Sequence, residues 1–308
     1  MVDMVLGIDG GGTKTAATLI CLHDDPLRQL GAGTSGPSNI AAVTVQSAFD
    51  AICAAASEAL SGVDGHLRAI CIGVAGYSHI QRRADLSQRL AKSFPGVLME
   101  VVPDYAIAFD AALNGQPGVL VISGTGQIAY GENAAGKWHR AGGYGYLIDD
   151  AGSGYGVGRA ALAATLAAQD GSGPLTALGS AICRRVGVSQ LEDVVSEVYG
   201  GKIDRQTIAS LAEAVSDCAA SGDMVAQEIL ATAGAALSRI ALAVIDQLFT
   251  KSETVALATV GSLWKAHSSL SDAFETGLID SGRHTIRCAS VTSPELGAAL
   301  RARKLAQC

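Results

Sequence analysis

The residues best suited to chemistry lie near the N-terminus, where Ile8 is followed by Asp-Gly-Gly-Gly-Thr-Lys-Thr. Apolar runs flank this stretch, so it predicts a strand, a tight turn and a second strand over Val5–Ile20. Glycine lets the backbone turn sharply and allows a ligand to approach closely. The turn, with Gly11, Gly12, Thr13 and Lys14, presents N–H groups, hydroxyls and an ammonium to an anion. Asp9 ends the first strand and is suited to hold a hydrated Mg²⁺.

This pattern predicts a phosphate-binding hairpin; the alternative is an ordinary glycine turn with a solvated lysine. A Walker A loop is excluded because Lys14 follows a threonine and a strand, not a helix, comes next. The Gly-x-Gly-x-x-Gly spacing occurs at Gly31, Gly33 and Gly36, but Pro37 follows and no helix opens there. We therefore expect a loop over Gly31–Asn39, not a dinucleotide site.

A second strand-turn-strand pattern follows about 110 residues later, over Gly118–Gly131. Its turn contains Gly124, Thr125 and Gly126. Two such hairpins predict a duplicated domain with a phosphate chain held between the copies, although a chance second glycine turn is the alternative. A block over Ala141–Gly156 then has six glycines among sixteen residues. Loops that are this costly to order are typical of ligand sites, with a mobile linker as the alternative.

Composition narrows the class of protein. The 308 residues suffice for two domains, and 49% hydrophobic with 17% charged residues indicates a globular chain. The net charge of -7 argues against nucleic acid as a partner. Arg239 and Asp246 interrupt the most apolar long stretch, Ala235–Phe249, so we expect no membrane span. We also expect no signal peptide, and seven scattered cysteines suit a reduced cytoplasmic protein.

Hydrophobic periodicity predicts strands alternating with helices, and hence an α/β sheet with helices on its faces. Besides the hairpins, the expected strands are a short one within 21–30, then Leu67–Ala75, Val97–Val102, Thr254–Val260 and Thr285–Val291. The expected helices are Val43–Leu60, Ile80–Ser93, Tyr105–Leu113, Val157–Gln169, Leu175–Val186, Gln206–Ala220, Asp223–Phe249, one beginning at Gly261–Ser262, and Pro294–Gln307.

Three motifs together resemble a known superfamily that contains sugar kinases, actin and heat-shock chaperones. They are Gly7-Ile-Asp-Gly-Gly-Gly-Thr-Lys-Thr, Ile122-Ser-Gly-Thr-Gly, and the block from Gly142-Gly-Tyr-Gly to Gly152-Ser-Gly. Nearly the whole chain is similar to the N-acetylglucosamine/glucosamine kinase branch of the BadF/BadG-type ATPase family. That resemblance implies two actin-like (ribonuclease H-like) lobes with a cleft, residues 1–113 plus about 294–308 and residues 114–293.

The resemblance also implies a reaction: transfer of the ATP γ-phosphate to the 6-hydroxyl of an amino sugar, N-acetylglucosamine or glucosamine, with Mg²⁺. Asp104 matches the catalytic aspartate that accepts the hydroxyl proton, although an Asp before a helix is also a common N-cap. The two hairpins match the phosphate motifs, with Asp9 organising Mg²⁺. Gly261 and Ser262 resemble the adenosine motif. Asn39, Gly143, Tyr144 and Asp150 match sugar-contacting positions, while Asp110 is read as structural.

Some positions depart from the family pattern. Tyr144 replaces the usual tryptophan, Ala151 replaces the glutamate of Gly-Asp-Glu-Gly-Ser, and Pro103 replaces the asparagine before the catalytic Asp. A related class of ATPases activates radical dehydratases or acyl-CoA reductases through cluster-binding cysteines. This chain has no cysteine between Cys71 and Cys183, which disfavours that function. A sugar-sensing or chaperone-like module without transfer is a further alternative, disfavoured by the intact Asp104. The family resemblance implies a homodimer.

Overall fold

The computed structural model describes residues 2–288 and 292–307. They form two compact units, one of Met1–Gln116 with Cys288–Cys308, the other of Pro117–Arg287. Each unit is built around one five-stranded sheet with helices packed on it, which is the α/β class that the periodicity predicts.

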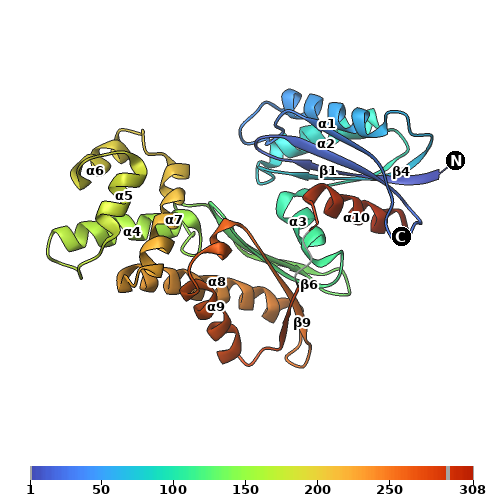
Figure 1. Ribbon diagram of the computed structural model, residues 1–308. Helices are drawn as coiled ribbons and strands as arrows, with labels where there is room; N and C mark the ends of the chain where they lie inside the picture. The colour runs from blue at the N-terminus through green and yellow to red at the C-terminus, as the bar shows by residue number, and fades with distance from the viewer. Residues whose placement is uncertain (1, 289–291, 308) are drawn as a thin grey trace. The chain divides into compact units, whose positions relative to one another are not determined.

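The first unit carries its sheet in the strand order β3-β2-β1-β4-β5. Its elements are β1 (Val2–Gly10), β2 (Thr15–Cys21), β3 (Gln29–Ser35), α1 (Val45–Leu60), β4 (Gly65–Val74), α2 (Ile80–Ser93), β5 (Leu98–Pro103), α3 (Asp104–Leu113) and α10 (Pro294–Gln307). Figure 1 shows α1 and α2 on one face of this sheet and α3 with α10 on the other. Every residue of β2 is buried, as expected for a strand covered on both faces.

The Gly31–Asn39 prediction of a loop is wrong in its first half, because β3 extends to Ser35. The glycines there serve packing against α1. A Cβ on Gly31 would stand 2.0 Å from the Ala59 carbonyl oxygen, and one on Gly33 would stand 2.1 Å from that of Ala55. The spacing that mimics a dinucleotide motif therefore reflects a helix lying directly on an edge strand.

The C-terminal helix α10 belongs to the first unit. It lies so close to β1 that a Cβ on Gly7 would meet the Ala299 nitrogen at 2.1 Å. On α3 the fully buried Asp110 accepts a hydrogen bond of 2.6 Å from Arg301 Nε and lies 3.3 Å from Lys304 Nζ. Asp110 is thus a structural anchor for α10, as the sequence predicts.

The second unit repeats this topology in the order β10-β9-β6-β7-β8. Its elements are β6 (Gly118–Ser123), β7 (Gln127–Glu132), β8 (Trp138–Gly142), α4 (Gly154–Gln169), α5 (Leu178–Val186), α6 (Leu191–Tyr199), α7 (Arg205–Ala220), α8 (Met224–Leu248), β9 (Val255–Val260), the 3₁₀ turn η1 (Ser262–Lys265), α9 (Ser269–Asp280) and β10 (Thr285–Arg287). In both units the first three strands are antiparallel neighbours and the last two run parallel to the first. This equivalence is what a duplicated domain predicts.

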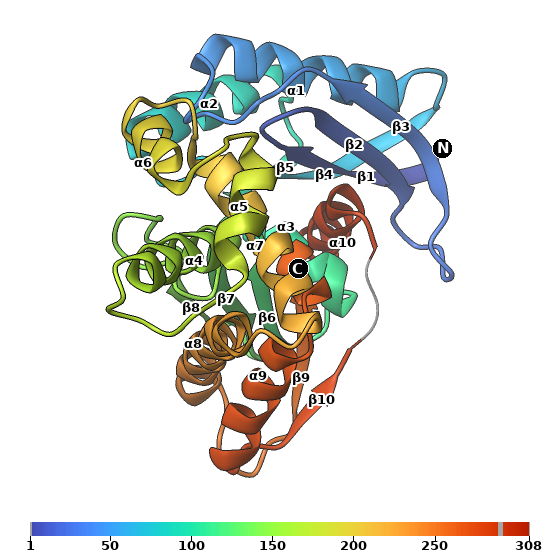
Figure 2. The same cartoon turned by 60° about the vertical axis from the view of Figure 1, so that its left-hand side comes forward.

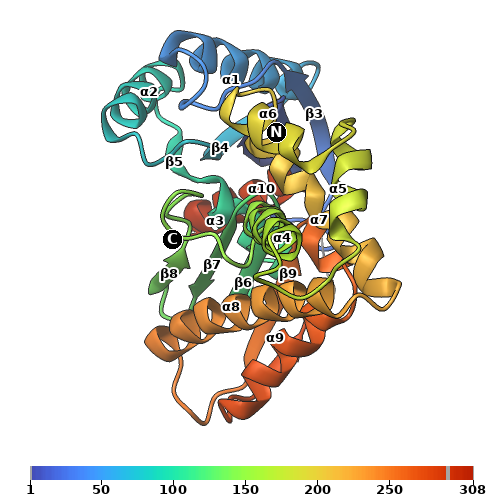
Figure 3. The ribbon, with the colours of Figure 1, turned by 90° about the vertical axis from the view of Figure 1, so that its left-hand side faces the viewer.

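Helix α8 is the longest in the second unit, and Figure 3 shows α8 and α9 lying together. It is the one helix of the described residues long and apolar enough to cross a membrane by length and composition. Here it packs on β6, β7 and β8, and Leu237, Ala241 and Ile245 are fully buried. Its apolar composition therefore serves the core of the unit. Figure 2 shows the remaining helices α4, α5, α6 and α7 grouped together.

The structure differs from the sequence prediction at three elements. Strand β8 and helix α6 are not predicted, and the single helix predicted from 261–262 is divided into η1 and α9. The strand expected over Thr285–Val291 ends at Arg287, and its positions 289–291 lie outside the described residues.

Candidate functional site

The first glycine turn is held by its own backbone and by the loop after β3. The Gly11 N–H donates to the Lys14 carbonyl at 3.1 Å, and the Gly11 carbonyl accepts from the Ser38 and Asn39 N–H groups. These contacts leave Gly12, Thr13 and Lys14 exposed at the tip. The tip therefore presents a lysine ammonium, a hydroxyl and backbone N–H groups outward, as the phosphate-binding prediction requires.

Asn39, a predicted sugar contact, lies beside this turn. Its Oδ1 accepts from the Ala41 N–H at 2.9 Å, and its Nδ2 lies 3.9 Å from where a Cβ of Gly12 would stand. Gly76, with φ of +81°, passes so close that its Cβ would lie 2.7 Å from Asn39 Oδ1. The site therefore requires glycine at 76, both for its backbone dihedral and for space.

Carboxylates gather behind the first turn. Burial, and then the charges of Asp104 and Glu295, raise the pKa of Asp9 to about 6, while the Lys14 charge opposes this. Asp104 begins α3, and its Oδ1 accepts from the Tyr105 N–H at 2.9 Å. The residue is exposed, yet desolvation by the surrounding protein raises the pKa of its carboxyl. The sequence offered no sign of Glu295, which arrives on α10.

This group of carboxylates fits a hydrated Mg²⁺. Among residues 2–288 and 292–307, no set of three or more His, Cys, Asp or Glu side chains is arranged to chelate a metal. Mg²⁺ commonly takes one or two carboxylates and completes its shell with waters and phosphate oxygens. Burial is the main cause of the raised pKa of Asp9 and the charges of Asp104 and Glu295 add to it, and a cation beside the carboxyl would oppose both effects.

The second glycine turn is fixed by a different loop, the one that precedes α4. Ser123 Oγ donates to the Gly152 carbonyl at 2.6 Å, and the Gly154 N–H donates to the Gly124 carbonyl at 2.8 Å. Gln127 Oε1 accepts from the Gly152 N–H at 2.7 Å. Thr125 remains exposed at the tip. The glycine-dense block thus serves as a support for this turn, which excludes the mobile-linker reading of its second half.

Asp150, predicted to contact the sugar, lies behind this turn. Its Oδ1 accepts from the Gln127 N–H at 2.9 Å. Its side chain is only 3% exposed, and Oδ2 has no hydrogen-bond partner in the described chain. Burial raises the pKa of the carboxyl, against the lowering effects of the Gln127 N–H and Arg205. These contacts make Asp150 a positioning residue for the turn, and its contact with a sugar stays a prediction.

Gly261 closes the far side of the second turn. It follows β9, the strand beside β6, with φ of +121°. A Cβ at this position would stand 2.0 Å from the Ser123 carbonyl oxygen and 3.0 Å from the Gly124 nitrogen. Only glycine permits so close an approach. Ser262 follows at the start of η1 and is exposed.

A cavity of about 630 Å³ opens between these elements, within the size range of small-molecule sites. Gly124, Thr125 and Ser262, all predicted nucleotide contacts, line it together. The rest of its lining comes mainly from α7 and η1: Gln206, Ala209, Ser210, Ala212, Glu213, Ser216, Asp217, Leu263, Lys265 and Ala266, with Gly154. The sequence did not point to α7, because its contribution depends on tertiary packing. The cavity joins the second glycine turn to a mixed polar and apolar wall, a lining that is compatible with a nucleoside phosphate.

Gly143 and Tyr144 lie in the loop after β8. Gly143 has φ of +73°, and a Cβ there would meet Ile128 Cδ1 at 2.8 Å. The Tyr144 side chain is exposed, with the Arg140 guanidinium 5.2 Å from its ring centroid. An exposed aromatic face next to a cation can take an apolar or sugar surface. The proposed sugar role of both residues is open to test.

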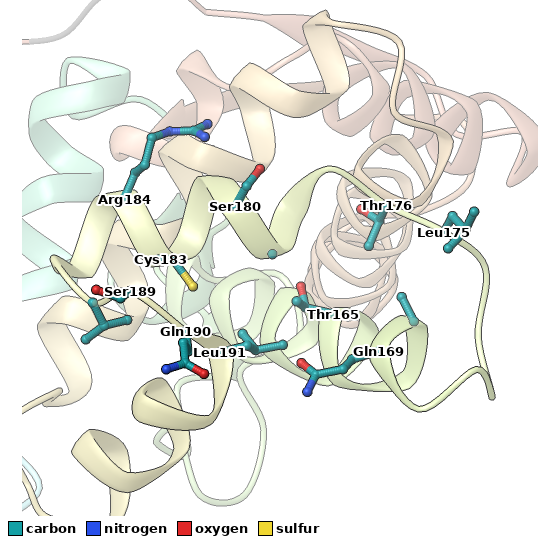
Figure 4. Close-up of a pocket in the computed structure, with 13 residues that line it drawn as sticks. Thr165, Gln169, Leu175, Thr176, Ser180, Cys183, Arg184, Ser189, Gln190 and Leu191 are labelled. Atoms are coloured by element: carbon teal, nitrogen blue, oxygen red, sulfur yellow. The ribbon is translucent and has the colours of Figure 1, made fainter.

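Another cavity, of about 590 Å³, lies among α4, α5 and the start of α6. Figure 4 shows Thr165 and Gln169 on one side and Cys183 across from them, with the Arg184 guanidinium pointing away from Gln169 and Gln190. It contains none of the predicted site residues and no carboxylate. It therefore lacks the groups that phosphoryl transfer needs, and the chemistry is better placed at the two turns.

The chain is similar to known proteins over nearly its whole length. Residues 6–302 match the model of the BadF/BadG/BcrA/BcrD ATPase family. An N-acetylmuramic acid/N-acetylglucosamine kinase of Clostridium acetobutylicum is 32% identical over 274 residues, which is 88% of each chain. An N-acetyl-D-glucosamine kinase of Dictyostelium discoideum is 30% identical over 319 residues, 97% of this chain and 98% of that one.

Solved structures agree on the fold. A Chromobacterium violaceum protein, provisionally assigned as an N-acetylglucosamine kinase, is 25% identical with a TM-score of 0.73 over 99% of both chains. A ROK family glucokinase from Streptomyces griseus, solved with glucose and AMPPNP, has a TM-score of 0.55 at 19% identity, covering 98% and 99% of the two chains. These matches confirm the predicted two-unit sugar-kinase fold. The chain belongs to the BadF/BadG/BcrA/BcrD ATPase family.

Proposed function

We propose that the protein transfers the γ-phosphate of ATP to the 6-hydroxyl of an amino sugar, N-acetylglucosamine or glucosamine. The observation that carries this proposal is the repeated turn. Two equivalent hairpins each present exposed phosphate-binding groups, and one of them has Asp104 close enough to Asp9 for their charges to interact. The names of the Clostridium and Dictyostelium relatives support an amino sugar as the acceptor.

Each unit supplies a distinct part of the reaction. In the second unit the cavity along α7 takes adenosine, with Gly261 and Ser262 beside it, and Gly124, Thr125 and Gly126 contact the phosphates. In the first unit Lys14 neutralises charge on the terminal phosphates and the Gly12 N–H donates to them, with Gly11 and Thr13 beside them. Asn39, Gly143, Tyr144 and Asp150 orient the sugar. Positioning and charge neutralisation supply most of the rate enhancement in phosphoryl transfer.

Asp104 acts as the general base. Its raised pKa makes it a better proton acceptor than an ordinary aspartate. It takes the proton of the 6-hydroxyl as that oxygen attacks the γ-phosphorus and the bond to the β-phosphate oxygen breaks, giving ADP and the sugar 6-phosphate. A Mg²⁺ held by Asp9 through water would supply further neutralisation of the phosphate charge. A homodimer and a cytoplasmic location are further expectations.

A release assay for ADP tests this function. Purified protein with ATP and Mg²⁺ is offered N-acetylglucosamine, glucosamine, N-acetylmuramic acid and glucose, and Asp104→Asn is run beside it. We expect ADP release that depends on an amino sugar and on Asp104. Full sugar-dependent release by Asp104→Asn would refute the mechanism. An iron–sulfur cluster bound by the purified protein would favour the activator class instead.

A further inference from the structure

The second turn has no cation of its own. The first hairpin carries Lys14 within its tip, whereas the turn between Ser123 and Gln127 contains only uncharged residues. Terminal phosphates of a nucleotide carry several negative charges, and phosphate sites usually include a charged donor as well as backbone N–H groups. A protein cation at the second turn would have to come from elsewhere in the fold.

Arg205 stands beside that turn. It is the first residue of α7, where the Asp204 side chain caps the helix by accepting from the Thr207 N–H at 2.8 Å. A Cβ placed on Gly126 would lie 3.2 Å from Arg205 Nη2 and 3.5 Å from each Asp150 carboxylate oxygen. Glycine at 126 therefore leaves the guanidinium and the turn backbone in direct proximity. The spacing of 79 positions between Gly126 and Arg205 hides this from the sequence.

Two neighbours contact the Arg205 guanidinium without accepting hydrogen bonds from it. It lies over the Tyr146 ring at 4.8 Å from the centroid, which fixes one face. Its Nη2 lies 3.6 Å from the buried Asp150 Oδ2, too far for a hydrogen bond. Within the described residues, none of its five N–H donors forms a hydrogen bond. The side chain is 42% exposed, so the donors stay accessible.

A purely structural salt bridge explains this arrangement less well. A salt bridge between a buried carboxylate and an arginine is normally closed by hydrogen bonds, because the buried charge otherwise stays desolvated. Here Asp150 uses its other oxygen to hold the Gln127 N–H, so it orients the turn and draws Arg205 toward it. Asp150 and Tyr146 thus place the Arg205 guanidinium next to the backbone of the second turn. This arrangement suits bidentate recognition of phosphoryl oxygens.

We propose that Arg205 contacts phosphoryl oxygens at the second turn, with Asp150 as its positioning residue. The phosphoryl group belongs to the nucleotide or to the phosphorylated sugar, and this proposal deepens the proposed kinase function on which it rests. The test uses the variants Arg205→Gln and Arg205→Lys. The matched control is Arg159→Gln, which removes the same charge from an exposed position of α4.

The experiment measures binding of adenosine, AMP, ADP and N-acetylglucosamine 6-phosphate by calorimetry with Mg²⁺. Removing a charged hydrogen-bond donor is expected to weaken ADP binding about 10- to 100-fold in Arg205→Gln. Adenosine binding should match that of the unchanged protein, which shows that the cavity is intact. Arg205→Lys keeps the charge but not the planar fork, so its loss should be intermediate. Arg159→Gln should bind every probe normally.

The four probes distinguish a nucleotide phosphate from a sugar phosphate, and both from a purely structural role of Arg205. A loss for ADP assigns Arg205 to the nucleotide, and a loss for the sugar phosphate alone assigns it to the transferred group. Equal affinity of Arg205→Gln and the unchanged protein for all four probes overturns the proposal. So does an equal loss for adenosine, which means a structural role. The kinase function can fail in the ADP-release assay while the ADP result still stands.

Discussion

The two glycine turns occupy equivalent places in one repeated sheet topology, between the first and second strands of each unit, but they are equipped differently. The first turn carries Lys14 in its own tip, with Asp9 and Asp104 near it. The second is uncharged and is supported by Gln127 and Asp150, with Arg205 arriving from α7. Under the proposed function, the first unit would carry the base and the second would hold the nucleotide.

The largest effect should come from the base in the first unit. Asp104→Asn is expected to lower kcat about 10²- to 10⁴-fold, the usual contribution of a general base. Its affinity for ADP should be unchanged, because the cavity that we propose for adenosine is lined only by residues of the second unit. The measurement is steady-state ADP release together with calorimetric ADP binding. Asp64→Asn, an exposed position of the same unit, provides the control for charge, and an equal loss of ADP affinity would break the division of labour.

Removal of the first turn's cation should have the next largest effect. Lys14→Gln is expected to lower kcat/KM about 10- to 100-fold, through the loss of a charged donor to the phosphates. The exposed Lys251→Gln serves as the control for net charge. A loss no larger than that of Lys251→Gln would mean that Lys14 is only a surface charge.

The close approach of Gly261 to the second turn predicts a stability effect. Gly261→Ala forces a Cβ against the Ser123 carbonyl and should lower the free energy of unfolding by about 1–3 kcal/mol. Gly282→Ala is the comparison, since its φ of +69° is a left-handed conformation that alanine adopts at a modest cost and no atom lies within 4 Å. Urea unfolding and ADP binding measure the pair. Equal destabilisation by both variants would show that the contact with Ser123 is unimportant.

The raised pKa of Asp9 predicts a stability effect of opposite sign. Its pKa is raised to about 6, so the folded chain holds this proton more tightly than the unfolded chain. Its ionisation therefore destabilises the fold as the pH rises from about 4 to about 6, and Asp9→Asn should stabilise the metal-free protein by about 1–3 kcal/mol at pH 7.5.

Thermal unfolding across pH measures this effect. The difference between Asp9→Asn and the unchanged protein should vanish below pH 4, and Asp64→Asn should show none. Activity should behave in the opposite way, being low in Asp9→Asn at all pH values. Asp9→Asn that is less stable at pH 7.5 would contradict the crowded-carboxylate interpretation.

Local signals revealed most of the fold. Apolar periodicity predicts the bounds of α2 and α10 as the structure has them, and the two hairpins stand where the glycine turns place them. The failures have tertiary causes. Gly31 and Gly33 suggested a loop, yet they are strand residues whose missing side chains admit α1. Tertiary packing, which no local pattern encodes, decides such positions.

The candidate site residues also fall into those that local sequence predicts and those that tertiary packing decides. The sequence points to residues within each turn, because glycine, hydroxyl and charge occur there at short spacing. It does not point to Glu295, Gln127 or Arg205, which reach the turns from α10, β7 and α7. The assignment of Asp150 came from resemblance, and the structure gives it a role behind the second turn that resemblance did not suggest.

The most direct test of the central claim is identification of the product. The protein is incubated with Mg²⁺, N-acetylglucosamine and ATP labelled in the γ-phosphate, and the sugar is examined by phosphorus NMR and mass spectrometry. We predict one labelled phosphate on the 6-oxygen for each ADP released, and none with Asp104→Asn. Label found only in inorganic phosphate, or on the sugar at the same rate with Asp104→Asn, would contradict the account.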